Sequence, residues 1–107
     1  MSMIFFDTEL IEEVRKDRGL NRAKLSLLLT EKKKDRPPRA NFIRELIANG
    51  GMCQSLENAS LLVNWYGSLD CISHCDEPAR NELESRLEEY KEEQKYIAEH
   101  EFDVIKY

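Results

Sequence analysis

Residues 55–70, SLENASLLVNWYGSLD, form the most apolar stretch of this 107-residue chain and decide its fold. Their apolar side chains recur at the spacing of an α-helix, and they cover more than one side of it. A helix that is apolar over so much of its circumference is usually central or lies between two surfaces. We therefore expect a helix over residues 55–69 with one main apolar face and a second, flanking set. The main face holds Leu56, Ala59, Leu62, Val63 and Tyr66, and the flanking set holds Leu61, Trp65 and Leu69.

Helices are also expected before and after this segment. The first begins at Asp7 or Thr8 and ends at Gly19, because Asp and Thr are good N-caps and Gly is a good C-cap. Asn21 caps a second helix, which a lysine run and Pro37 bring to an end. A third helix is predicted over residues 38–49, before Gly50 and Gly51.

The last helix is predicted over residues 78–100, with proline at its first position. Leu83, Leu87, Tyr90, Gln94 and Ile97 follow one another at the spacing of a coiled-coil seam, which Val104 extends after a charged break at Glu101. The prediction is an all-α single domain, residues 1–107, of four to five helices in a small bundle with a long C-terminal helix. FDVIKY, residues 102–107, is the only candidate strand. Self-association or core packing is predicted for Leu83, Leu87 and Tyr90.

Charge is distributed unevenly along the chain. The net charge is −5, but residues 1–50 carry eleven basic and eight acidic side chains, whereas residues 51–107 carry five basic and thirteen acidic ones. This asymmetry favours head-to-tail charge pairing and argues against non-specific binding of polyanions. No stretch is apolar enough for a membrane helix, the first residues do not fit a secretory signal, and the cysteine count is odd. We therefore expect a cytoplasmic protein.

A helix-turn-helix that binds DNA is one alternative to an all-α protein-binding domain. NRAKLSLLL, residues 21–29, could support a reading helix in RANFIRELIANG, residues 39–50, but the basic segment between them is too long for the usual tight turn. We regard DNA binding as the alternative function. Its candidate phosphate contacts are Lys32, Lys33, Lys34, Arg36, Arg39 and Arg44.

A metal site and a catalytic site are two further alternatives. Cys53, Cys71, His74 and Cys75 are the ligand types of a structural zinc site, but Cys53 has no ligand near it in sequence. Ser68, Asp70, Ser73 and His74 lie close together in the sequence, which by itself is not evidence of a triad. We predict no metal, no cofactor and no catalysis.

Protein binding is the favoured function, because the chain has more large apolar side chains than five short helices should need to bury. Aromatic side chains are frequent anchors of protein interfaces. Two groups of residues are predicted to contact a protein partner, one at the N-terminus and one in the central helix. They are Ile4, Phe5 and Phe6, and Leu61, Leu62, Trp65 and Tyr66.

Two stretches resemble a known family: MIFFDTELIEEVRKDRG, residues 3–19, and ENASLLVNWYGSLD, residues 57–70. The chain resembles the QslA-like antiactivators of bacterial quorum sensing, which are small helical regulators. The resemblance implies a homodimer that binds the ligand-binding domain of a LuxR-type transcription activator. Such binding would block the dimerisation of the activator and so its binding to DNA. No single contact residue can be carried over from this resemblance.

Overall fold

The chain begins with a strand that organises a small sheet. The computed structural model describes residues 3–31 and 37–105, and within them β1 (Ile4–Phe6) is the middle strand of three. It pairs antiparallel with β2 (Met52–Cys53) on one side and with β3 (Ile72–Cys75) on the other. Ile4 lies opposite Cys53 and Cys75, so this one strand joins segments that are far apart in the sequence. The prediction of an all-α fold is therefore too strict.

Five α-helices and one 3₁₀ turn make up most of the described residues, so the predicted mostly helical fold is confirmed. Asp7 and Asn21 act as N-caps, since their side chains accept hydrogen bonds from backbone N–H groups of the first turn. Gly67 ends the central helix at a φ of 101°. The helices are α1 (Thr8–Asp17), α2 (Arg22–Thr30), α3 (Phe42–Ala48), α4 (Leu56–Tyr66) and α5 (Glu77–Ile105), and the 3₁₀ turn is η1 (Leu69–Cys71).

The ends of three helices differ from the prediction. α3 begins at Phe42 rather than Pro38, and α4 stops at Tyr66 because Gly67 takes a left-handed conformation. α5 is longer than predicted and reaches Ile105, so the stretch considered as a strand is helical as far as the structure describes it. Residues 106 and 107 lie outside the described residues.

One hydrophobic cluster draws side chains from the sheet and the helices. α4 is central to it, as predicted: Ala59, Leu62 and Val63 are fully buried. The first turns of α5 cover one side of α4 through Ala79, Leu83 and Leu87, which are also buried. The remaining buried apolar side chains are Ile4, Phe6, Ile11, Leu25, Leu29, Phe42, Ile43, Leu46, Cys53, Cys71 and Ile72.

Side-chain hydroxyls of α2 fix α3 in place. The Oγ of Ser26 accepts a hydrogen bond of 2.9 Å from the backbone N–H of Ile43, in the first turn of α3, and donates one to the carbonyl of Arg22. Asn41 makes no side-chain capping bond, so Ser26 satisfies one of the N–H groups that a helix start leaves open. In the same way, Thr30 Oγ1 accepts from the N–H of Arg39 at 2.8 Å.

A charged network joins α1 to α2. Arg15 and Arg22 both donate to the carboxylate of Glu12, and Arg15 also donates to the carbonyl of Leu20 at 2.7 Å. Partial burial alone would raise the pKa of Glu12, but the hydrogen bonds and charges of the two arginines outweigh it and hold this pKa below its ordinary value. The network fixes the turn between the two helices.

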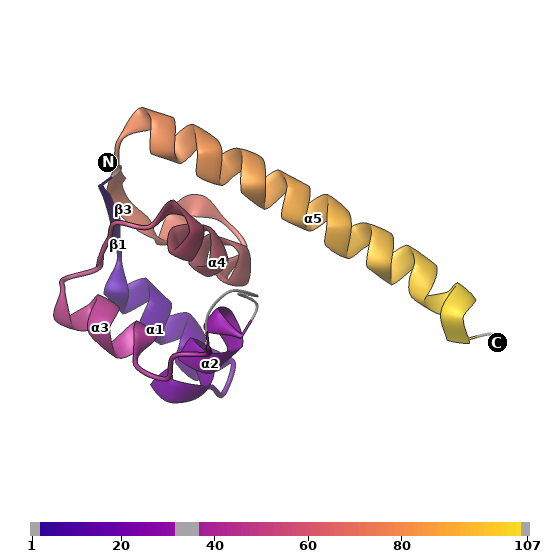
Figure 1. Ribbon diagram of the computed structural model, residues 1–107, viewed down its shortest axis with the longest axis horizontal. Coiled ribbons are helices and arrows are strands. Elements are labelled where there is room, and N and C mark those ends of the chain that lie inside the picture. The colour runs from indigo at the N-terminus through magenta and orange to yellow at the C-terminus, as the bar shows by residue number, and fades with distance from the viewer. Residues whose placement is uncertain (1–2, 32–36, 106–107) are drawn as a thin grey trace.

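Only the first half of α5 lies on the rest of the molecule. Figure 1 shows α5 crossing α4 and then continuing as a single helix away from all other elements. A helix of 29 residues is about 44 Å long at 1.5 Å per residue, which is close to the longest extent of the whole molecule, 48 Å. Within the described residues, none of the helices has the length and hydropathy to cross a bilayer.

Candidate protein interface

The N-terminal residues predicted to contact a partner lie in the sheet. Ile4 and Phe6 point into the hydrophobic core and are buried, so the prediction that they are exposed for a partner is wrong. Alternation along a strand turns Phe5 to the other face, where it is half-buried near His74, with ring centroids 6.3 Å apart. Pairing at both edges makes β1 the middle strand, and the core side chains of the helices cover the face that bears Ile4 and Phe6.

The predicted contact residues of α4 divide in the same way. Leu62 is fully buried, so it belongs to the core and its predicted contact with a partner is wrong. Leu61, Trp65 and Tyr66 are half-buried and pack against the core from outside. The guanidinium of Arg18 lies 4.6 Å from the ring centroid of Trp65 and also donates to its carbonyl at 2.7 Å. Trp65 therefore joins α4 to the end of α1 and presents only part of its surface.

The seam of α5 passes from the core into solvent. Leu83 and Leu87 are buried against the globule, Tyr90 is half-buried, and every described side chain from residue 91 to residue 99 is exposed. Ile97 is 51% exposed and its neighbour Tyr96 is 62% exposed. We call residues 91–105 of α5 the arm. The apolar pattern that packs the first half of the helix thus continues into the arm, where Ile97 is exposed.

A second exposed apolar patch lies on α2. None of its residues was among the predicted partner contacts. Leu27 is 40% exposed and Leu28 is 41% exposed, whereas Leu25 and Leu29 on the opposite side are buried. The run LSLLL, residues 25–29, carries the signal, because three consecutive leucines must point to more than one side of a helix. Lys24 lies one turn before Leu28 and is exposed beside it.

The arm and the patch on α2 differ in charge. Residues 88–99 carry five glutamates and two lysines, a net charge of −3, whereas residues 22–30 of α2 carry Lys24, an Arg22 that is paired with Glu12, and no acidic side chain. Glu31, directly after α2, is also exposed. Opposite charges around two apolar patches favour their association and disfavour contact between two arms.

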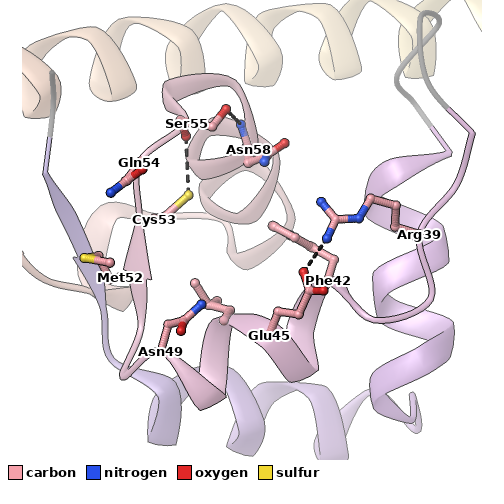
Figure 2. Close-up of a pocket in the computed structure, with 10 residues that line it drawn as sticks. Arg39, Phe42, Glu45, Asn49, Met52, Cys53, Gln54, Ser55 and Asn58 are labelled. Atoms are coloured by element: carbon pink, nitrogen blue, oxygen red, sulfur yellow. Dashed lines mark hydrogen bonds and ion pairs between the residues drawn. The ribbon is translucent and has the colours of Figure 1, made fainter.

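A pocket with both polar and apolar lining residues lies elsewhere, between α3, β2 and the start of α4 (Figure 2). Its volume is about 330 Å³, and Arg39 forms an ion pair with Glu45 on one wall. On the other wall, Cys53 Sγ donates to the carbonyl of Ser55 at 3.4 Å, and Asn58 Oδ1 is buried with no hydrogen-bond partner. None of the ten lining residues is a histidine. The pocket therefore offers hydrogen-bonding groups and one ion pair.

The candidate zinc ligands do not come together. Within residues 3–31 and 37–105, the structure has no group of three or more Cys, His, Asp or Glu side chains placed to hold a metal ion. Cys53 lies in β2 and Cys71 is the last, buried residue of η1, whereas Cys75 and His74 are in β3, on opposite faces of the strand. The alternation of β3 separates ligands that appear adjacent in the sequence.

The hydroxyl groups of the catalytic alternative have structural partners. Ser68 Oγ accepts from the N–H of Asp70 at 3.3 Å and caps η1, and Ser73 Oγ donates to the carbonyl of Phe5 at 3.1 Å. Each hydroxyl thus supports the turn or strand in which it lies. His74 faces Phe5 in the sheet.

Two of the six candidate phosphate contacts lie within the described residues. Arg39 is engaged with Glu45, and Arg44 is exposed on α3. α3 has only seven residues and follows α2 after an eleven-residue connection, so the supposed reader lacks both the length and the tight turn of a helix-turn-helix. Lys32, Lys33, Lys34 and Arg36 lie outside the described residues.

The thiol of Cys71 gives a prediction about the dependence of stability on pH. Burial raises the pKa of Cys71 to about 12. In the unfolded chain the thiol ionises near its ordinary pKa of about 8.5, whereas in the folded protein it keeps its proton. The unfolded state therefore binds fewer protons above this pH, and the free energy of unfolding must fall as pH rises from about 9 toward 12.

Urea denaturation at pH 8 and pH 10 checks this expectation. The free energy of unfolding should decrease more between these two values for the wild type than for Cys71→Ala, which has no thiol to ionise at this position. An equal decrease for both proteins would contradict the assignment. Comparing the two slopes removes the constant cost of the lost sulfur atom and the contribution of other titrating groups.

Comparison of the chain with protein-family models, with curated proteins and with solved structures finds no match.

Proposed function

We propose that this protein is a non-catalytic regulator that binds another protein and occupies the surface its target needs. The target class is a LuxR-type transcription activator, as the resemblance of residues 3–19 and 57–70 implies. Blocking the dimerisation of an activator requires an apolar surface that competes for its dimerisation face, and it requires no chemistry.

The exposed arm of α5 is the observation that supports this proposal. A monomeric protein gains nothing in stability from apolar side chains on a helix that leaves its own globule, because their burial requires another surface. Ile97 continues the seam that Leu83 begins and is 51% exposed on the arm, and its neighbour Tyr96 is 62% exposed. An amphipathic helix that lays its apolar side in a groove of the partner is a common mode of recognition.

DNA binding is less well supported by the same structure. Arg39 is engaged in an ion pair, α3 is short, and the net charge of −5 opposes approach to phosphate. The surface of the long C-terminal helix is acidic between residues 88 and 99. DNA binding therefore remains an alternative, which the binding experiment below distinguishes.

Ile97→Glu tests the proposal, with Ala98→Glu as the matched control. Both changes place a glutamate on an exposed apolar position of the same helical turn, but they point to different sides. Binding to purified ligand-binding domains of LuxR-type activators from the same genome is measured by biolayer interferometry. Ile97→Glu should weaken binding at least about tenfold, which corresponds to about 1.4 kcal/mol. Ala98→Glu should bind like the wild type.

Two results would contradict the proposal. One is a wild-type protein that binds none of these activator domains. The other is tight binding to duplex DNA with a salt slope near −5, the value expected for about six phosphate contacts. Circular dichroism of each variant confirms that the helix content is unchanged, so that lost binding reports the surface and not the fold.

A further inference from the structure

We infer that a second copy of this chain covers the arm, in a reciprocal dimer in which Ile97 and Tyr96 of each chain contact Leu27 and Leu28 of the other. The inference concerns the same arm as the proposed function, and it adds what occupies the arm in the absence of an activator. It assigns a role to α2, whose exposed leucines the proposed function does not use.

Continuity of the seam is the first argument. Leu83 and Leu87 already pack α5 onto an apolar surface, and the same spacing leads to Ile97. Figure 1 shows that the arm leads away from α2 of its own chain, and Ile97, Leu27 and Leu28 are each at least 40% exposed. Between two molecules the two exposed patches can meet twice, because a two-fold axis that brings one arm to the partner's α2 brings the other arm back.

Charge is the second argument. It favours contact of the arm with α2 of the other chain over contact between the two arms. Two arms packed side by side would bring together two helices that each carry a net charge of −3 over residues 88–99. Lys24 instead lies next to Leu28, on a helix without acidic side chains. Like charges across an interface disfavour the association of two surfaces, and opposite charges favour it.

The reciprocal arrangement also accounts for the uneven charge of the chain. The first fifty residues have a net charge of +3 and the last fifty-seven a net charge of −8. Each contact in the dimer joins the basic half of one chain to the acidic half of the other. The two equivalent contacts together bury twice the area of one. A stable interface usually buries about 1,200 Å² or more, which favours two contacts over one.

Sedimentation equilibrium of the purified protein alone gives the first test. The wild type should show a mass of two 12.6 kDa chains at high concentration and a shift toward one on dilution. Ile97→Glu and Leu28→Glu should each weaken the association at least about tenfold, and Ala98→Glu should not. A wild type that is monomeric at every concentration would overturn the inference.

Cross-linking between two variants identifies which surfaces touch. In a Cys75→Ser background, one protein carries Leu28→Cys and the other carries Ile97→Cys, and they are mixed before mild oxidation. We expect a disulfide between the two chains, and none when Arg80→Cys, in the part of α5 near the globule, replaces Ile97→Cys. Preferential cross-linking of Ile97→Cys to itself would show that two arms pair and would overturn the inference.

The two proposals can fail independently. These measurements contain no activator, so a missing dimer leaves the binding of an activator by the arm untouched. Conversely, a confirmed dimer together with no activator binding would leave the reciprocal contact standing and remove the proposed function.

Discussion

Gly51→Ala is expected to lower the free energy of unfolding by about 3–5 kcal/mol, a large part of the stability of a small domain. Gly51 has a φ of +89°, and a Cβ atom at this position would lie 2.1 Å from the carbonyl oxygen of Phe6. That oxygen belongs to the backbone of β1, so no side-chain rotation can relieve the clash. Gly51 also makes two backbone hydrogen bonds of 2.8 Å. Its carbonyl accepts from the N–H of Phe6, and its own N–H donates to the carbonyl of Leu46.

Gly50→Ala is the matched control for this experiment. Its φ is +68°, but nothing lies within 4 Å of the position that its Cβ would take. It should therefore cost only the strain of a left-handed alanine, about 1–2 kcal/mol. Urea denaturation of both variants measures the difference. A similar loss for the two would show that backbone conformation alone, and not the contact with β1, explains the glycine at position 51.

Leu83→Ala is expected to cost about 2–5 kcal/mol, the range for removing a buried leucine from a packed core. Leu83 is fully buried where α5 crosses α4. Truncation removes the contacts of three carbon atoms and leaves a cavity, since α4 and α5 are both held by neighbouring side chains and cannot collapse onto it. Thermal unfolding should move to a clearly lower midpoint.

Ile97→Ala is the control on the same seam. At protein concentrations low enough for monomers, it should change the free energy of unfolding by less than about 0.5 kcal/mol, because Ile97 is exposed on the arm. The pair of variants separates the structural half of α5 from the half assigned to binding. If Ile97→Ala were as destabilising as Leu83→Ala, the arm would belong to the folded core and the proposed interface would be lost.

Local signals in the sequence were sufficient to predict most of the helices. Asp7 and Asn21 cap α1 and α2 as expected, because an N-cap side chain bonds to N–H groups two or three residues ahead. The apolar pattern of residues 55–70 correctly indicated a central helix, since α4 is surrounded by the rest of the core. These features depend on neighbours within one or two turns, which the sequence contains directly.

The candidate interface was predictable only in part. The seam of α5 is visible in the sequence, but its spacing alone does not tell where the globule ends, which decides that Leu87 is buried and Ile97 exposed. Likewise, the three consecutive leucines of α2 show that one side must be exposed, whereas the contact of Ser26 with Ile43 fixes which side it is. Exposure is a property of the whole arrangement and not of a local pattern.

By itself, the sequence determined the helical character of this protein, the centre of its core and the opposite charges of its two halves. Only the tertiary structure decided that residues 4–6 form a strand, because three residues have no stable conformation until β2 and β3, about 50 and 70 residues away, supply hydrogen-bond partners. That pairing buries Ile4 and Phe6 and removes them from the surface. It also requires glycine at position 51, where the chain passes too close to Phe6 for any side chain.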